Sequence, residues 1–212
     1  MYPACMGGKV IKQVPHPMPL WFRLAYLGLA VALVPVYAIH YPWVNFFWFS
    51  NLALLGGLVA AWTSSSRLAS ALLVCVGLLE LGWIVDFLGG LVLMGQAPFG
   101  MVDYMFDPEI PLLVRALSLY HLVLPFALWW MVWRLGYDAR AWRWLVPAGW
   151  GVVLITRLTV DEGQNVNWVL SMPWLEPGRI HEGLWLLLLM LGLGIAWWVT
   201  HRLVLWFMQR HE

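Results

Sequence analysis

Charged residues are scarce in this sequence. They make up 11% of the 212 residues, whereas a soluble domain has about 25%. The formal net charge is only +1, so the chain lacks the basic surplus that favours a nucleic-acid partner. This scarcity, a hydrophobic fraction of 62% and a mean hydropathy of +0.76 together indicate a polytopic membrane protein.

Cysteine is nearly absent, and patterns that bind metals are missing. Cys5 precedes the apolar part of the chain and Cys75 lies within it, so neither a disulfide nor a cysteine-ligated metal is expected. The histidines form no H-x-x-x-H or C-x-x-C-H pattern, and we predict no metal and no cofactor. No internal repeat points to a transporter, and no G-x-S-x-G motif occurs.

Six segments are long and apolar enough to cross a bilayer, which requires about 20 residues for a core about 30 Å thick. They cover residues 20–40, 43–63, 68–93, 110–134, 142–160 and 182–207. We predict an all-α fold in which residues 20–208 form a bundle of six transmembrane helices. A tail at 1–19 and a short C-terminus at 209–212 flank the bundle. The seventeen tryptophans suit this class, because Trp gathers at the headgroup level.

Basic residues fall mainly on one side of these predicted helices. With a cytoplasmic N-terminus, that side holds Lys9, Lys12, Arg23, Arg67, Arg134, Arg140, Arg143, Arg202 and Arg210. The excess of positive charge predicts that both termini are cytoplasmic, and we expect a bacterial inner membrane. The two long outer connections, 94–109 and 161–181, mix aromatics, acids and turn formers, as functional loops do. Gly89 and Gly90 are expected to end the third helix early or turn it back.

Several polar side chains fall within the predicted spans, where an ionisable group costs about 2.5–3.5 kcal/mol and usually has a partner. They are Asn45, Ser50, Asn51, Glu80, Asp86, Arg115, Ser118, Tyr120, His121 and Arg157, with Asp161 just beyond. At about 1.5 Å per residue, Arg115 lies roughly 8 Å, Ser50 roughly 11 Å and His121 roughly 16 Å below the outer surface. Glu80 lies near mid-membrane. We infer a pocket that opens outward, with its floor near Glu80 and His121.

Purely structural interpretations of these groups remain open. Arg115 and Asp86 can form an ion pair that locks two helices, and Arg157 can pair with Asp161 four residues along the chain. His121 can be a neutral histidine bonded to Glu80 or Tyr120. The hydroxyl and amide groups can be interhelical hydrogen bonders of the usual membrane kind.

Two functional classes follow. The first is an intramembrane hydrolase or transferase that acts on a lipid or other amphiphile. Ser50 is its nucleophile, His121 its general base and Glu80 the carboxylate that orients the base, with Arg115 or Asn51 binding an anion or oxyanion. The other predicted substrate-binding residues are Asn45, Asp86, Ser118, Arg157 and Asp161. The second class is a non-catalytic structural or assembly subunit. The predicted partners are membrane lipids and, in the second class, other membrane protein subunits.

Five stretches are distinctive: NFFWFSN (45–51), DYMFDP (103–108), LSLYHLVLP (117–125), WRLGYDARA (133–141) and NVNWV (165–169). Together they resemble a family of bacterial multi-pass membrane proteins that has no assigned activity. The likeness covers most of the chain.

A more distant likeness rests on His121 and the Leu-Pro-Phe at 124–126, combined with the earlier polar patch. This combination is similar to the androgen-induced (FAR-17a) type of transmembrane hydrolases and to YwaF-type proteins. In those hydrolases a Thr and a His act as the catalytic pair on lipid esters, which implies a catalytic role for His121. Here Ser50 is the nearest hydroxyl to the position of that Thr, and Leu-Pro-Phe follows His121 after two residues rather than three.

Overall fold

The structure is a computed structural model that describes residues 16–161, 163–175 and 178–210. Its elements are α1 (Leu20–His40), η1 (Trp43–Phe47), α2 (Phe49–Thr63), α3 (Ser66–Val92), η2 (Asp103–Met105), α4 (Leu112–Ser118), α5 (Tyr120–Leu135), α6 (Ala141–Thr159), η3 (Val166–Trp168) and α7 (Glu182–Arg210). The described ranges contain no strand, which confirms the all-α prediction. Most of the predicted N-terminal tail and the last two residues lie outside them.

Within the described residues, four helical units are long and apolar enough to cross a membrane: α1, α3, the continuous α4–α5 pair and α7. The protein therefore has the character of a membrane protein. Helix α2 has 15 residues and is about 22 Å long, which is shorter than a hydrocarbon core of about 30 Å. Helix α6 has 19 residues but falls short in hydropathy.

The predicted span at 43–63 differs from the structure at its beginning. Residues Trp43–Phe47 form a 3₁₀ turn after Pro42, and the extended backbone of Trp48 separates that turn from α2. Hydropathy alone cannot distinguish such a turn from a further helical turn, because both are apolar. The other five predicted segments agree with the helices to within a few residues.

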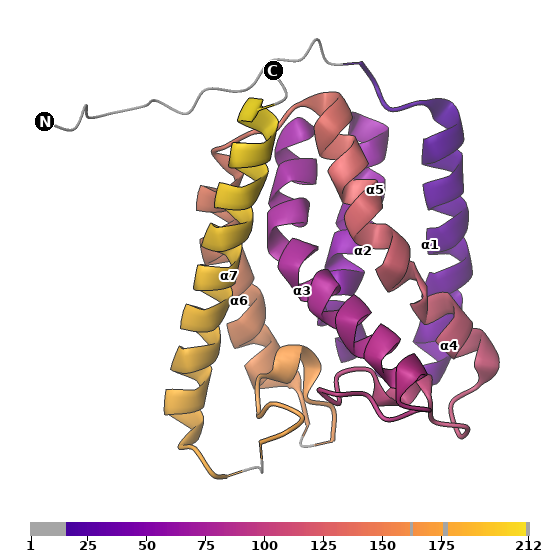
Figure 1. The fold of residues 1–212 in the computed structure, drawn as a ribbon, viewed down its shortest axis with the longest axis vertical. Coiled ribbons are helices and arrows are strands. Elements are labelled where there is room, and N and C mark those ends of the chain that lie inside the picture. Colours follow the sequence, from indigo (N-terminus) through magenta and orange to yellow (C-terminus); the bar gives the residue numbers. More distant parts are fainter. Residues whose placement is uncertain (1–15, 162, 176–177, 211–212) are drawn as a thin grey trace, which may run out of the picture.

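Helix α3 is the centre of the bundle and packs against α2, α5, α6 and α7. Neighbouring helices run in opposite directions, so the connections collect at two ends (Figure 1). We call the end with the connections 93–111 and 160–181 the loop end. The opposite end, where α1 begins and α7 ends, is called the terminal end.

The glycine pair of α3 does not break the helix, which continues to Val92. The pair instead lets the following loop pack closely. A Cβ on Gly89 would lie 2.5 Å from the Pro98 ring, and one on Gly90 would lie 2.3 Å from the Phe106 ring. The absence of side chains at these positions thus seats the α3–α4 connection on the loop end of α3.

Candidate functional site

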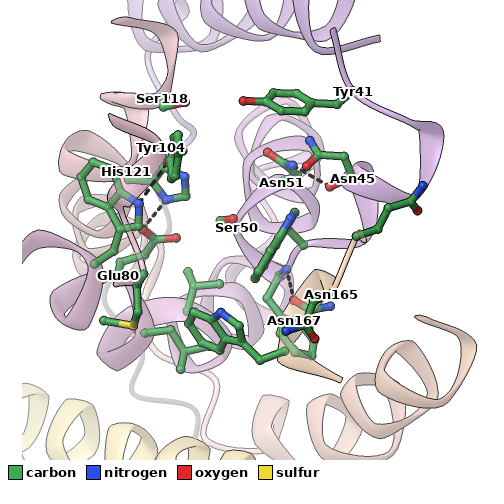
Figure 2. Close-up of a pocket in the computed structure, with 18 of the residues that line it drawn as sticks. Tyr41, Asn45, Ser50, Asn51, Glu80, Tyr104, Ser118, His121, Asn165 and Asn167 are labelled. Carbon is green, nitrogen blue, oxygen red and sulfur yellow. Dashed lines mark hydrogen bonds and ion pairs between the residues drawn. The ribbon is translucent and has the colours of Figure 1, made fainter. Parts of the chain in front are cut away.

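A cavity of about 420 Å³ lies at the loop end of the bundle. Helices α2, α3 and α5 contribute to its walls, and parts of both long connections line it as well (Figure 2). The residues predicted from the sequence that line it are Asn45, Ser50, Asn51, Glu80, Ser118 and His121. Four other predicted residues do not line it, namely Asp86, Arg115, Arg157 and Asp161.

Glu80 of α3 and His121 of α5 form a hydrogen-bonded pair on the wall of this cavity. His121 Nδ1 lies 2.8 Å from Glu80 Oε2, and the two side chains are 12% and 3% exposed. The imidazole also stacks on Trp83, with ring centroids 4.7 Å apart, and on Tyr120, at 4.1 Å. Its Nε2 has no hydrogen-bond partner among the described residues. The ring is therefore held through one nitrogen, and the other is left for the cavity.

Ser50 is the second residue of α2 and lines the same cavity. Figure 2 shows it between the Glu80–His121 pair and the asparagines of the α6–α7 connection. Within the part of the chain that the structure describes, Ser50 and His121 form no hydrogen bond. The structure thus brings the predicted nucleophile and base to one cavity without joining them.

A chain of hydrogen bonds fixes the neighbouring wall. The Tyr120 hydroxyl donates to Asn51 Oδ1 at 2.8 Å, and Asn51 Nδ2 donates to the backbone oxygen of Asn45, also at 2.8 Å. Ser118 pairs with the Tyr37 hydroxyl at 2.6 Å. These amides and hydroxyls already have partners, so their main role is to hold α1, α2 and the α4–α5 unit in register.

Asp86 and Arg115 do not form the predicted ion pair. The Asp86 carboxylate is fully buried and accepts the backbone N–H groups of Phe99 at 2.6 Å, Met101 at 2.8 Å and Val102 at 3.2 Å. Arg115 donates instead to the backbone oxygen of Met105 at 3.3 Å. A carboxylate that accepts several backbone N–H groups needs no cation. Asp86 therefore anchors the α3–α4 connection to α3.

The predicted pairing of Arg157 with Asp161 is also replaced. Arg157 donates to Glu182, which is the first residue of α7. This ion pair is partly exposed and lies away from the cavity lining. Arg157 turns to α7 because α6 ends at Thr159 and the chain beyond it no longer follows the helical spacing that the prediction assumed.

The α6–α7 connection supplies residues that the sequence did not single out as site residues. Asn167 has a left-handed backbone conformation, with φ at +53°, and its side chain joins the start of α2. Its Oδ1 accepts the Phe49 N–H at 3.0 Å, and its Nδ2 donates to the Phe47 carbonyl at 2.8 Å. Asn165, also at positive φ, closes the connection on itself by bonding Leu170 and Ser171. The Asn-x-Asn pattern, which suits left-handed positions, was the available signal.

Tryptophan and tyrosine side chains also do more than pack. Trp83 Nε1 donates to the Tyr104 hydroxyl at 3.2 Å, which joins α3 to the α3–α4 connection beside His121. Burial, reinforced by the nearby Tyr37, raises the pKa of the Tyr104 phenol well above its usual value. The phenol is therefore neutral at physiological pH. No lysine or arginine is found among the described residues that line the cavity.

No group of three or more His, Cys, Asp or Glu side chains that could hold a metal ion occurs among the described residues. In the comparisons with known proteins, no family model, curated protein or solved structure matches the chain. The likeness to bacterial membrane proteins and transmembrane hydrolases therefore stays a prediction.

Proposed function

We propose that the protein is an integral membrane enzyme of the hydrolase or transferase class, acting on a lipid or other amphiphile at the loop end of the bundle. The observation that carries the proposal is the buried Glu80–His121 pair. His121 lines the cavity, and its Nε2 has no hydrogen-bond partner among the described residues. The positive-inside pattern of the sequence supports the further proposal that this end faces away from the cytoplasm.

The pair has the geometry of an orienting carboxylate and a general base. When Nδ1–H donates to Glu80 Oε2, Nε2 is the basic nitrogen. It can then take a proton from a hydroxyl group, and Glu80 stabilises the imidazolium that forms. Stacking on Trp83 and Tyr120 limits rotation of the ring. The base is thus preorganised by contacts that precede substrate binding.

Ser50 is the proposed nucleophile because it lines the same cavity and carries a hydroxyl group. Its Oγ attacks the carbonyl carbon of an ester, its proton passes to His121 Nε2, and the imidazolium returns that proton to the departing alkoxide. Water or an acceptor alcohol then releases the acyl group from Ser50. Hydrogen bonds of this kind are often long in a free enzyme and tighten when the substrate binds.

The proposed oxyanion donors differ from those that the sequence suggested. Arg115 is outside the lining, and the Asn51 amide is already bonded to Asn45. The side-chain amides of Asn45 and Gln164 both belong to residues on the cavity and have no partner within the described ranges. They are the better candidates for stabilising a developing negative charge.

The lining favours an uncharged reacting group. The cavity is mainly aromatic and aliphatic, and the described lining holds no lysine or arginine. A phosphate at the reaction centre would be recognised by arginine or lysine. A neutral ester or amide carbonyl, with an acyl chain that extends toward the bilayer, suits this composition better.

A fluorophosphonate probe, which labels activated serines, tests the proposal on the full chain in mild detergent. We expect labelling of the wild type and loss of labelling in Ser50→Ala and His121→Gln. Ser118→Ala is the matched control, since that hydroxyl lies on the same cavity but is bonded to Tyr37 and Val114. Equal labelling of wild type and Ser50→Ala, or no labelling of either, would contradict the proposal and leave the non-catalytic subunit as the better interpretation.

A further inference from the structure

A second cavity, also of about 420 Å³, lies at the terminal end of the bundle. Its described lining consists of Arg67, Arg140, Arg143 and Trp144. Arg67 lies in the first turn of α3, and Arg140 directly precedes the first residue of α6. Three arginines from the starts of two different helices therefore line one cavity.

A single buried carboxylate holds two of these arginines in place. Asp138 Oδ2 lies 3.3 Å from Arg67 Nε, and Asp138 Oδ1 lies 3.1 Å from Arg140 Nε. Asp138 is 3% exposed, and its own N–H donates to Ser70 Oγ. Burial acts to raise the Asp138 pKa, but hydrogen bonds from Arg140 and Arg67 outweigh burial, so the pKa is lowered. The carboxylate remains charged at neutral pH.

One negative charge does not balance three positive ones, so the cluster has an excess of two positive charges. Arg143 forms no salt bridge with any described carboxylate, and Arg67 and Arg140 have side chains 59% and 46% exposed. Their remaining N–H groups are free to bind an anion. Guanidinium groups bind phosphate in a planar, two-pronged arrangement that a single ammonium cannot provide.

The position of the cavity indicates the kind of anion. Trp144 on its rim is 70% exposed, and tryptophan gathers at the boundary between acyl chains and headgroups. The cavity lies at the end of α3, which is apolar enough to cross a membrane. Basic pockets at such helix ends suit anionic headgroups. A phosphate at this level can belong to a lipid whose chains lie along the helices.

We propose that Arg67, Arg140, Arg143 and Trp144 form a binding site for the phosphate group of an anionic lipid headgroup. Asp138 organises the site but does not contact the lipid phosphate. This site is independent of the proposed enzymatic function, since it lies at the opposite end of the bundle and shares no lining residue with the first cavity.

Native mass spectrometry of the full chain, released from detergent after incubation with lipid, tests the site. The probes are dioleoyl phosphatidylglycerol, dioleoyl phosphatidylcholine and inorganic phosphate. We expect phosphatidylglycerol to bind more tightly than phosphatidylcholine. Arg143→Gln should weaken phosphatidylglycerol binding about fivefold, which corresponds to one lost arginine contact at the membrane surface. Because Arg143 has no carboxylate partner within the described ranges, this variant retains the Asp138 ion pairs and should fold normally.

Arg210→Gln is the matched control. Arg210 is an exposed arginine near the terminal end, and its guanidinium lies 4.1 Å from the centre of the Trp206 ring. Phosphatidylglycerol binding should be unchanged in this variant. Equal weakening by both substitutions would show non-specific attraction and overturn the proposal. Binding of inorganic phosphate that depends on Arg143, without binding of phosphatidylglycerol, would show a free-phosphate site and overturn the lipid assignment.

Discussion

The loop-end and terminal-end cavities described above differ in how their charged side chains are paired. At the loop end, one carboxylate and one imidazole are bonded to each other, and the surrounding described lining is aromatic, aliphatic or neutral. At the terminal end, Arg67 and Arg140 share the Asp138 carboxylate, Arg143 has no carboxylate partner among the described residues, and all three arginines are exposed. Helix α3 contributes to both, with Glu80 in one and Arg67 in the other.

Depth in the bundle explains the difference. A charge within the hydrocarbon region must be neutralised or paired, because water cannot reach it. Glu80, which is almost fully buried, therefore has a partner directly beside it. Near a headgroup layer, water satisfies unpaired guanidinium groups, so an excess of positive charge is tolerated. This difference is the basis for proposing chemistry on a neutral group at the loop end and binding of an anion at the terminal end.

The largest effect is expected from substituting His121 at the loop end. His121→Gln removes the basic nitrogen, and we expect turnover to fall by about 10²–10⁴-fold, which is the usual contribution of a general base. The measurement is hydrolysis of a neutral fluorogenic ester by the purified protein. His40→Gln is the control, since His40 is exposed and its Nδ1 bonds only the Val36 carbonyl of its own helix. Similar losses in both variants would separate His121 from the chemistry.

A second test concerns how the loop end is held together. Asp86→Asn places an amide N–H₂ where a carboxylate oxygen accepts backbone N–H groups. We expect the free energy of unfolding to fall by about 1–3 kcal/mol, because at least one buried donor loses its acceptor. Thermal unfolding in detergent measures the change. Asp107→Asn should have little effect, because Asp107 is more exposed and accepts one bond within its own turn.

At the terminal end, the stability that Asp138 contributes should depend on pH. Asp138→Asn should lower the free energy of unfolding by about 1–2 kcal/mol at neutral pH, since the arginine partners are half-exposed. The pKa of Asp138 is lowered below its ordinary value of 3.8. Its stabilising effect is therefore complete above that pH and is lost as the pH falls through the lower native pKa. The melting temperatures of wild type and variant should converge in strong acid, and a constant gap would contradict the assignment.

The smallest effect is expected from Arg143→Gln in the absence of lipid. Arg143 has no carboxylate partner in the part of the chain that the structure describes, so the substitution should change the free energy of unfolding by no more than about 0.5 kcal/mol. Thermal unfolding in detergent measures the change. A larger loss would mean that Arg143 supports the fold, and the terminal end would then resemble the loop end more than we propose. Addition of phosphatidylglycerol should stabilise the wild type more than this variant.

Much of the helical framework could be predicted, because hydropathy records which segments avoid water. The start of α2 could not, since the turn at Trp43–Phe47 is as apolar as a helix. The proximity of Glu80 and His121 could be predicted, because their estimated depths in the membrane are similar. The role of Asp86 was not, because its partners are backbone N–H groups of a loop whose path depends on tertiary packing. Charge pairing was the natural expectation there, and backbone donors replaced it.

The asparagine at position 167 has a consequence for how a ligand reaches Ser50. Its side chain bonds both Phe47 and Phe49, so the connection over the cavity and the first turn of α2 are one hydrogen-bonded unit. Ser50 is the next residue in that turn. A ligand that enters by displacing the α6–α7 connection must break the hydrogen bonds of Asn167 to the start of α2. The same movement would shift Ser50, the proposed nucleophile. Entry and alignment would then be a single event, and hydrogen exchange at the Phe49 amide would report on both.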